Sequence, residues 1–154
     1  MKKILLLLLS TITILLAQEK TAQVVYDLTT TNMEIFERKI LKAIVANKAH
    51  YEGLLSELDV VVVIHGDAYK FFTKTPLKTI YKEDKLLIEN HKTLAKRIKS
   101  MVDNYDVEFL MCGAGMKKRE LKKENIYKFV TIIPNSTIGL IDKQNEGYAY
   151  IPVD

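Results

Sequence analysis

The feature that most constrains this chain is a run of β-branched residues from Val60 to Ile64, which follows Asp59. Side chains branched at Cβ lose rotamer freedom in a helix and pack well on a pleated surface, so the run favours a strand. Polar and apolar residues do not alternate in this run. A continuous apolar run of this length indicates a central strand that is covered on both faces, as in parallel sheets. The run ends at His65-Gly66.

Strand-like and helix-like patterns alternate along the rest of the chain, which predicts βαβ units, a mainly parallel sheet and an α/β fold. The long helix is indicated by Leu87, Leu94 and Ile98 at helical spacing, with His91 on the same stripe in a structural role. The expected strands cover residues 23–27, 59–64, 107–111, 130–133 and 148–151. A first helix is expected to open at residues 31–34, and further helices are expected over residues 87–102, 122–129 and 138–145.

Local signals predict where several of these elements begin and end. Residues 31–34 have the form of a capping box that opens a helix, and Gly147 is placed to end the last helix. Asn47 falls on the inner face of the first helix, where we expect its amide to bond a neighbouring backbone group. The segment 67–72 is short and amphipathic and leads into a loop at Pro76.

The amino terminus predicts a secretory signal peptide over residues 1–17. Lys2 and Lys3 precede an uncharged stretch from Ile4 to Leu16, and Ala17 offers a cleavage point. The stretch is shorter than the roughly 20 residues that span a bilayer, so no stable membrane anchor is expected after cleavage. We therefore expect a periplasmic or secreted protein whose residues 18–154 form a single domain.

Composition excludes some classes of partner. Removing Lys2 and Lys3 leaves 21 basic residues against 19 acidic residues, a balance that argues against nucleic acid as a partner. One cysteine cannot form an internal disulfide in an oxidising compartment. It is therefore a buried inert residue, half of an intermolecular bridge, or a reactive thiol.

That cysteine, Cys112, lies between the expected strand 107–111 and a small-residue segment, 113–115, which predicts a loop. Ligands of open α/β sheets bind at the carboxyl ends of the strands, so we expect the thiol to be reachable there. The basic residues 117–119 follow directly. Their charge, together with the amides of a helix start, is expected to favour the thiolate.

Other polar residues also stand at the expected strand ends and should share this edge of the sheet. Asp27, His65 and Asn135 each follow an apolar run, as Cys112 does. An imidazole near a thiol can hold the thiolate or pass protons, so we name His65 with Cys112 as candidate catalytic residues. A structural histidine at a strand end is the competing interpretation. Whether His65 neighbours Cys112 depends on strand order, which the pattern leaves open.

Small residues at the same edge are candidates for binding a ligand. Gly66, Gly113 and Gly115 join Asp27 and Asn135 in this set. Two glycines at 113 and 115 fall short of a phosphate-binding fingerprint, and the potential ligands Cys112, His65 and Asp27 lack the spacing of a zinc site. We expect no cofactor and no bound metal.

Three strings resemble the DsrE/DsrF-like sulfur-relay superfamily, in particular its small secreted branch. They are residues 107–112, ending in Cys112; residues 60–66, followed by Ala68; and the closing segment 144–151. The resemblance implies a three-layer α/β/α sandwich with a five-stranded, mainly parallel sheet, assembled into dimers, trimers or hexamers. It also implies that Cys112 stands where related proteins bind sulfur as a persulfide.

The sequence therefore supports three hypotheses. The first is an exported sulfur carrier that holds a persulfide on Cys112, with donor and acceptor proteins or small sulfur anions as partners. The basic run 117–123 can attract such anions, although a run of this kind is also typical of a solvated face. The second is a non-catalytic module that binds a small ligand. The third is a structural homo-oligomer whose interface is the aromatic cluster at 69–81, for which core packing is the equal alternative.

Overall fold

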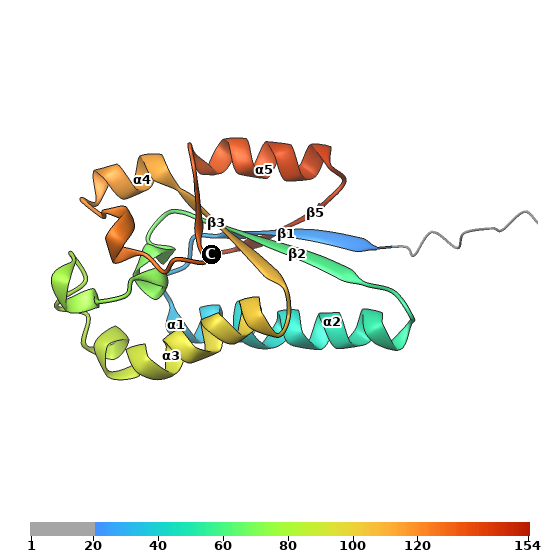
Figure 1. Cartoon of the computed structure of the whole chain (residues 1–154), viewed down its shortest axis with the longest axis horizontal. Helices are drawn as coiled ribbons and strands as arrows, with labels where there is room; N and C mark the ends of the chain where they lie inside the picture. The colour runs from blue at the N-terminus through green and yellow to red at the C-terminus, as the bar shows by residue number, and fades with distance from the viewer. Residues whose placement is uncertain (1–20) are drawn as a thin grey trace, which may run out of the picture.

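A computed structural model describes residues 21–154, which build one five-stranded sheet with helices on both faces (Figure 1). The predicted signal peptide, residues 1–17, lies outside the described residues. The strand order is β4-β3-β2-β1-β5, and every neighbouring pair is parallel. The strands are β1 (Ala22–Leu28), β2 (Leu58–Ile64), β3 (Val107–Cys112), β4 (Thr131–Ile133) and β5 (Ala149–Val153).

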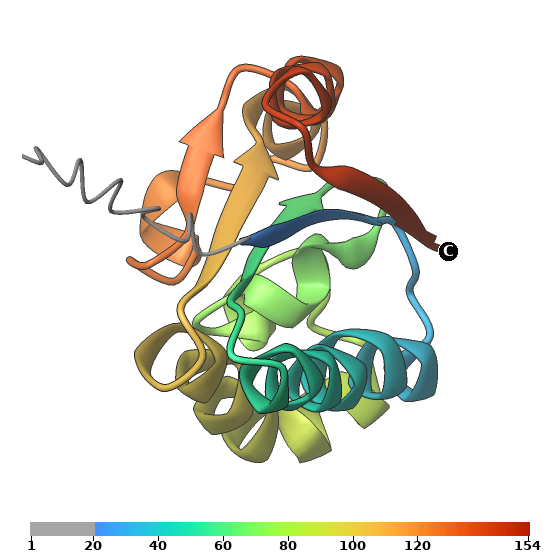
Figure 2. The same ribbon diagram turned by 90° about the vertical axis from the view of Figure 1, so that its right-hand side faces the viewer.

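The helices form two layers, so the predicted three-layer α/β/α sandwich is confirmed. In Figure 1 the α1, α2 and α3 helices lie below the sheet, whereas α4 and α5 lie above it. Figure 2 shows β4, in orange, and β5, in dark red, at opposite edges. The α-helices are α1 (Met33–Phe36), α2 (Ala43–Gly53), α3 (Lys85–Asp103), α4 (Gly113–Lys118) and α5 (Ser136–Asn145); a π-helical turn (Glu37–Lys42) joins α1 to α2, and 3-10 turns cover Ala68–Phe72, Pro76–Lys78 and Lys123–Asn125.

The β2 strand is the centre of the core, as its sequence predicts. Val60 to Ile64 are each no more than 1% exposed. Val60, Val62 and Ile64 pack in the cluster that faces α1, α2 and α3, whereas Val61 and Val63 pack in the cluster on the α5 side. Burying each such side chain stabilises the fold by about 1.5–3 kcal/mol. Within residues 21–154, no helix is both long and apolar enough to cross a membrane.

Two predictions about the first helix need correction. The capping residue is Asn32 rather than Thr31, because the Asn32 side chain accepts hydrogen bonds from the backbone N–H groups of Glu34 and Ile35. Asn47 is exposed, and its amide donates to the Tyr26 hydroxyl (3.3 Å) rather than to backbone.

The predicted helix at 122–129 is wrong. Only the 3-10 turn Lys123–Asn125 forms, and the chain then runs alongside residues 72–74. Tyr127 N–H donates to the Phe72 carbonyl (3.2 Å), and Lys74 N–H donates to the Asn125 carbonyl (2.7 Å). These non-local bonds satisfy backbone groups that a helix would have satisfied locally, and they are invisible to sequence periodicity.

The aromatic cluster at 69–81 belongs to the core, so the prediction that it forms an oligomer interface is wrong. Tyr69, Phe71 and Phe72 are fully buried, and Tyr81 packs partly buried against them. Phe71 stacks on Phe36 with ring centroids 4.3 Å apart. The predicted structural role of His91 agrees with its contacts: its Nε2 lies 2.8 Å from the Thr73 carbonyl oxygen.

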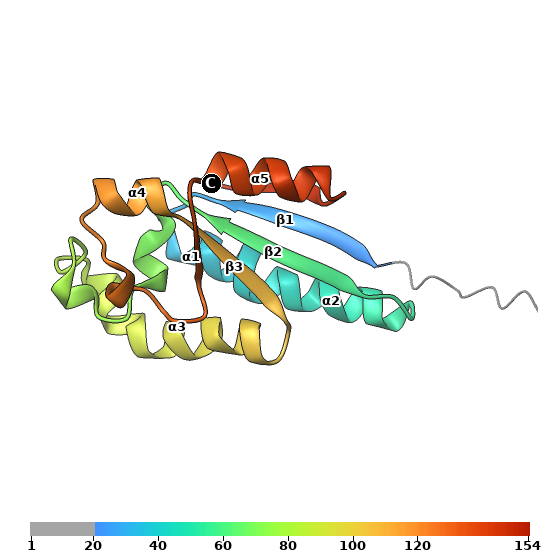
Figure 3. The same cartoon turned by 45° about the horizontal axis from the view of Figure 1, so that its top comes forward.

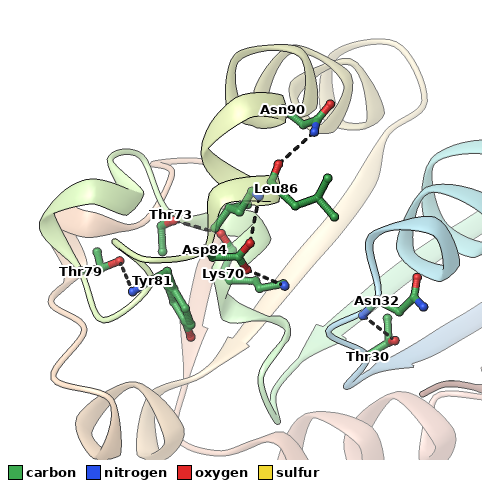
Figure 4. A network of polar contacts seen from close by, with 10 residues as sticks. Thr30, Asn32, Lys70, Thr73, Thr79, Tyr81, Asp84, Leu86 and Asn90 are labelled. Atoms are coloured by element: carbon green, nitrogen blue, oxygen red, sulfur yellow. Dashed lines mark hydrogen bonds and ion pairs between the residues drawn. The ribbon is translucent and has the colours of Figure 1, made fainter.

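A polar network fixes the loop that carries Tyr69 to the start of α3 (Figure 4). Asp84 is the N-cap of α3: one carboxylate oxygen accepts from the Leu87 N–H (3.0 Å) and the other from Lys70 Nζ (2.8 Å). Burial acts to raise the pKa of Asp84, but the Lys70 ammonium and the Leu87 N–H outweigh it, so the net pKa lies below the ordinary value.

Asp84→Ala should destabilise the protein by about 1 kcal/mol, because it removes a helix cap. Asp84→Asn keeps an N-cap oxygen but loses the ion pair, so it should destabilise the protein less than Asp84→Ala.

The contribution of Asp84 to stability should also depend on pH, because its pKa is lower in the folded state than in the unfolded state. This contribution is fully present above the unfolded-state pKa and is lost as the pH falls through the folded-state pKa. Urea unfolding at neutral and acidic pH tests both points; equal stabilities for wild type and Asp84→Ala at neutral pH would contradict them.

Candidate functional site

The carboxyl ends of the strands form one edge of the sheet, and Cys112 stands on it as the last residue of β3. Figure 3 shows α4 beyond this edge and the first turn of α5 above it. The α4 helix begins at Gly113, directly after the cysteine. The loop predicted for residues 113–115 is therefore the first turn of a short helix.

Cys112 is 6% exposed, so the expectation of a freely reachable thiol is wrong. The side chain lies beneath two helix starts, at Gly115 of α4 and Ser136 of α5. Its neighbours are polar as well as apolar, unlike those of an inert core cysteine. Beside it, Gly113 and Pro134 line a surface groove of about 620 Å³.

Hydrogen-bond donors of two segments surround the Cys112 sulfur. They are the backbone N–H of Gly115 and the backbone N–H and hydroxyl of Ser136, and the Tyr69 hydroxyl lies nearby. Burial acts to raise the pKa of the Cys112 thiol, but these donors stabilise the thiolate more, so the net pKa lies below the ordinary value. The Ser136 N–H belongs to the first turn of α5, where the helix dipole also favours an anion.

Tyr69 braces the backbone at the same point. Its ring is fully buried, and its hydroxyl donates to the Cys112 carbonyl oxygen (2.8 Å). A hydroxyl has one proton, so this bond leaves Gly115 and Ser136 as the main donors to the sulfur. A Cβ at Gly115 would overlap the Tyr69 hydroxyl and lie 2.9 Å from its Cζ, which explains why glycine stands there.

The basic run stabilises the thiolate less directly than predicted. Arg119 lies over the Tyr69 ring (5.0 Å to its centroid), its Nε donates to Asp67 (3.0 Å), and its Nη1 donates to the Gly115 carbonyl (3.3 Å). Arg119 therefore holds the α4 turn in place. The lowered pKa of Cys112 comes from neutral hydrogen-bond donors rather than from the lysines.

A second polar cluster joins three strands at this edge. Asp27 of β1 accepts through one carboxylate oxygen from His65, which follows β2, and through the other from the Tyr150 hydroxyl of β5 (2.6 Å). Burial acts to raise the pKa of Asp27, but the bonds from His65 and Tyr150 and the His65 charge lower it overall. His65 is thus held by a carboxylate rather than by backbone alone, with 27% of its side chain exposed.

The two clusters are adjacent, but no hydrogen bond joins them among the described residues. Ile64 pairs with Met111 in the β2–β3 register, so His65 and Cys112 are the next residues along neighbouring strands. Parallel strands lie about 4.8 Å apart. The strand order thus answers the question that the sequence left open: His65 stands on the strand next to Cys112, with its imidazole directed to Asp27.

The remaining predicted ligand residues have structural contacts. Gly66 adopts a positive φ of 61° in the turn after His65. Gly113 packs closely on β4: an added Cβ would lie 3.0 Å from the Ile133 carbonyl oxygen. Asn135 is the N-cap of α5, with its side-chain oxygen accepting from Ile138 N–H (2.9 Å). Asn135 thereby positions Ser136 beside the sulfur.

Comparison with known proteins identifies the family. Residues 15–153 match the model of the DsrE/DsrF-like family. The chain belongs to the DsrE/DsrF-like family. It is 33% identical over 92 residues to an uncharacterized protein of Aquifex aeolicus (strain VF5), a match covering 60% of this chain but 39% of that protein. A protein of unknown function from Methanobacterium thermoautotrophicum, MTH1491, has a similar fold: TM-score 0.59, 15% identity, covering 85% of this chain and 98% of that one.

Sequence reasoning missed three residues of the site in this DsrE/DsrF-like protein. Ser136 follows a Pro-Asn pair that signals a helix start, so its place at a helix amino terminus was predictable, although its proximity to Cys112 was not. Tyr69 and Tyr150 gave no local signal, because their contacts with Cys112 and Asp27 are long-range. Within residues 21–154, no three or more His, Cys, Asp or Glu side chains cluster as metal ligands would.

Ser136→Ala should raise the thiol pKa of Cys112 and slow its alkylation by iodoacetamide severalfold near neutral pH, because one donor to the thiolate is lost. Thr137→Ala is the matched control, since Thr137 is the exposed next residue of the same helix. The pH profile of the alkylation rate measures both. An unchanged profile for Ser136→Ala would show that its hydroxyl does not stabilise the thiolate.

Proposed function

We propose that this protein is a sulfur carrier that holds sulfane sulfur as a persulfide on Cys112. The observation that carries the proposal is the set of donors around the sulfur, which lowers the thiol pKa although the residue is buried. A thiolate is the nucleophilic form of cysteine, and donors that stabilise it also suit an anionic persulfide. Membership of the DsrE/DsrF-like family supports the same chemistry.

The reaction requires two exchanges with no net redox change. The Cys112 thiolate attacks the outer sulfur of a donor persulfide or polysulfide; an S–S bond forms at Cys112 while the donor's S–S bond breaks, and the donor leaves as a thiolate. An acceptor thiolate then attacks the outer sulfur of the Cys112 persulfide, and the Cys112 thiolate is the leaving group. The 6% exposure of Cys112 favours small sulfur anions as donors.

We assign His65 the role of proton donor and acceptor for the thiols that exchange at this edge. Asp27 holds one imidazole nitrogen, which leaves the other free to take or give a proton. His65 stands beside Cys112 in the register of β2 and β3. Tyr150 completes the support by donating to the second oxygen of Asp27.

The low exposure of Cys112 also favours a second function, a non-catalytic module in which the sheet edge holds a small ligand. In that case Cys112 is a packing residue, and no sulfur is transferred. The two functions differ in whether Cys112 acquires a sulfur adduct.

We further propose that the protein is exported and self-associates, as the leader pattern of residues 1–17 and the family resemblance imply. Intact mass of the protein from its native compartment tests cleavage after Ala17, and light scattering tests self-association. An uncleaved mass would contradict export, and a monomer would contradict assembly.

Incubation with polysulfide should add about 32 Da per sulfur atom to the intact mass, and reductant should remove the adduct. Cys112 is the only cysteine in the sequence, so Cys112→Ser must abolish the gain. Native-state mass spectrometry measures it. A wild-type chain that stays unmodified under these conditions would support the binding module instead.

His65→Gln should slow transfer of the loaded sulfur to an acceptor thiol by about a hundredfold or more, the scale of general acid–base catalysis, while loading still goes to completion. His50→Gln is the matched control, because His50 is exposed on α2. Single-turnover transfer from the loaded protein to a small thiol measures the rate in each variant. Equal rates for wild type and His65→Gln would remove His65 from the chemistry.

A further inference from the structure

A basic groove follows β4, an edge strand that pairs only with β3 among the described strands. Two neighbouring surface grooves of about 590 and 620 Å³ lie here and share Ile132 in their linings. We use the name β4 groove for the two together. Its apolar lining includes Ile126, Tyr127, Val130, Met116, Leu121 and Ile133.

Lysines line the β4 groove while acidic residues are scarce. Lys74, Lys123 and Lys128 line one half and Lys117 the other, with Glu124 as the one carboxylate among the lining residues. Lys74 Nζ donates to the Glu124 backbone oxygen (3.2 Å), not to a carboxylate. None of the four lysines forms an ion pair with a carboxylate within residues 21–154.

One end of the β4 groove adjoins the sulfur site. Gly113, which lines the groove, is the residue after Cys112, and Ala114 N–H donates to the Pro134 carbonyl (3.1 Å) to fix α4 on the end of β4. A persulfide extends the reactive sulfur outward by one S–S bond of about 2 Å. The groove lining reaches Gly113 but does not include Cys112, so a thiol carried by a seated molecule extends past Gly113 to reach the persulfide.

We propose that the β4 groove binds an acidic, partly apolar peptide segment of a partner protein that presents the acceptor thiol to Cys112. The proposal rests on the carrier function. Charge complementarity selects the occupant: unpaired lysines attract carboxylates, and the apolar lining needs aliphatic or aromatic side chains. A small anion would leave the half-buried Tyr127, Ile132 and Ile133 of the lining uncovered. The near-neutral balance of the mature chain argues against nucleic acid.

The test uses the full chain and fluorescent peptides with three repeating patterns: alternating Asp and Leu, alternating Asp and Ser, and alternating Lys and Leu, each ending in cysteine. Fluorescence anisotropy under reducing conditions should show that the Asp–Leu peptide binds at least about tenfold more tightly than the other two, and that salt weakens this binding. Equal binding of all three peptides would overturn the proposal.

Lys123→Glu with Lys128→Glu should weaken Asp–Leu binding by about tenfold, the combined effect expected of two exposed charge reversals. The matched control is Lys92→Glu with Lys96→Glu, an equal charge change at exposed positions of α3. Equal weakening by the two double variants would show non-specific attraction and overturn the assignment to the groove. The proposal would also be overturned if the protein bound anionic lipid vesicles but not the peptide, and if the groove variant abolished this vesicle binding.

Failure of the groove and failure of the carrier function give different results. The groove variant should take up sulfur from polysulfide as wild type does, yet transfer it to the Asp–Leu cysteine more slowly. Binding of the peptide without any sulfur uptake would reject the carrier function while the docking surface stands. Uptake with transfer unaffected by the groove variant would reject the docking surface alone.

Discussion

Burial of β2 on both faces is the constraint on which the rest of this structure depends. Five consecutive side chains, Val60 to Ile64, are almost completely removed from water, which requires helices on both sides and a strand on each edge. This arrangement aligns the carboxyl ends of β1, β2 and β3. Asp27, His65 and Cys112 come to one edge because they stand at or near the ends of these three strands.

The site at that edge balances burial against hydrogen bonding. Removing Cys112 from solvent disfavours the thiolate, and the donors of Gly115 and Ser136 more than offset this cost. The two donors belong to helices whose starts are fixed by other contacts: Arg119 holds the α4 turn, and Asn135 caps α5. The thiolate is thus stabilised by the fold itself, not by a single neighbouring charge.

Residues with local signals predicted much of the fold. The β-branched run Val60–Ile64 predicted the central strand of a parallel sheet, and Gly147 predicted the end of the last helix. The helix predicted at 122–129 failed because residues 125–127 bond across to residues 72–74, a contact of long sequence separation. Cys112 and His65 were found because strand ends are readable from sequence, whereas Tyr69 and Ser136 depend on how distant segments pack. The same packing buries Cys112 more deeply than its position suggested.

The most direct test of the account is the thiolate absorbance of Cys112 as a function of pH, taken as the ultraviolet difference between the wild type and Cys112→Ser. An ordinary cysteine titrates near pH 8.5, about the value expected without special donors. Stabilisation of the thiolate by the helix starts predicts a midpoint below that value in the folded protein and a return toward it on unfolding in urea. A folded-state midpoint at or above the ordinary value would contradict the central claim.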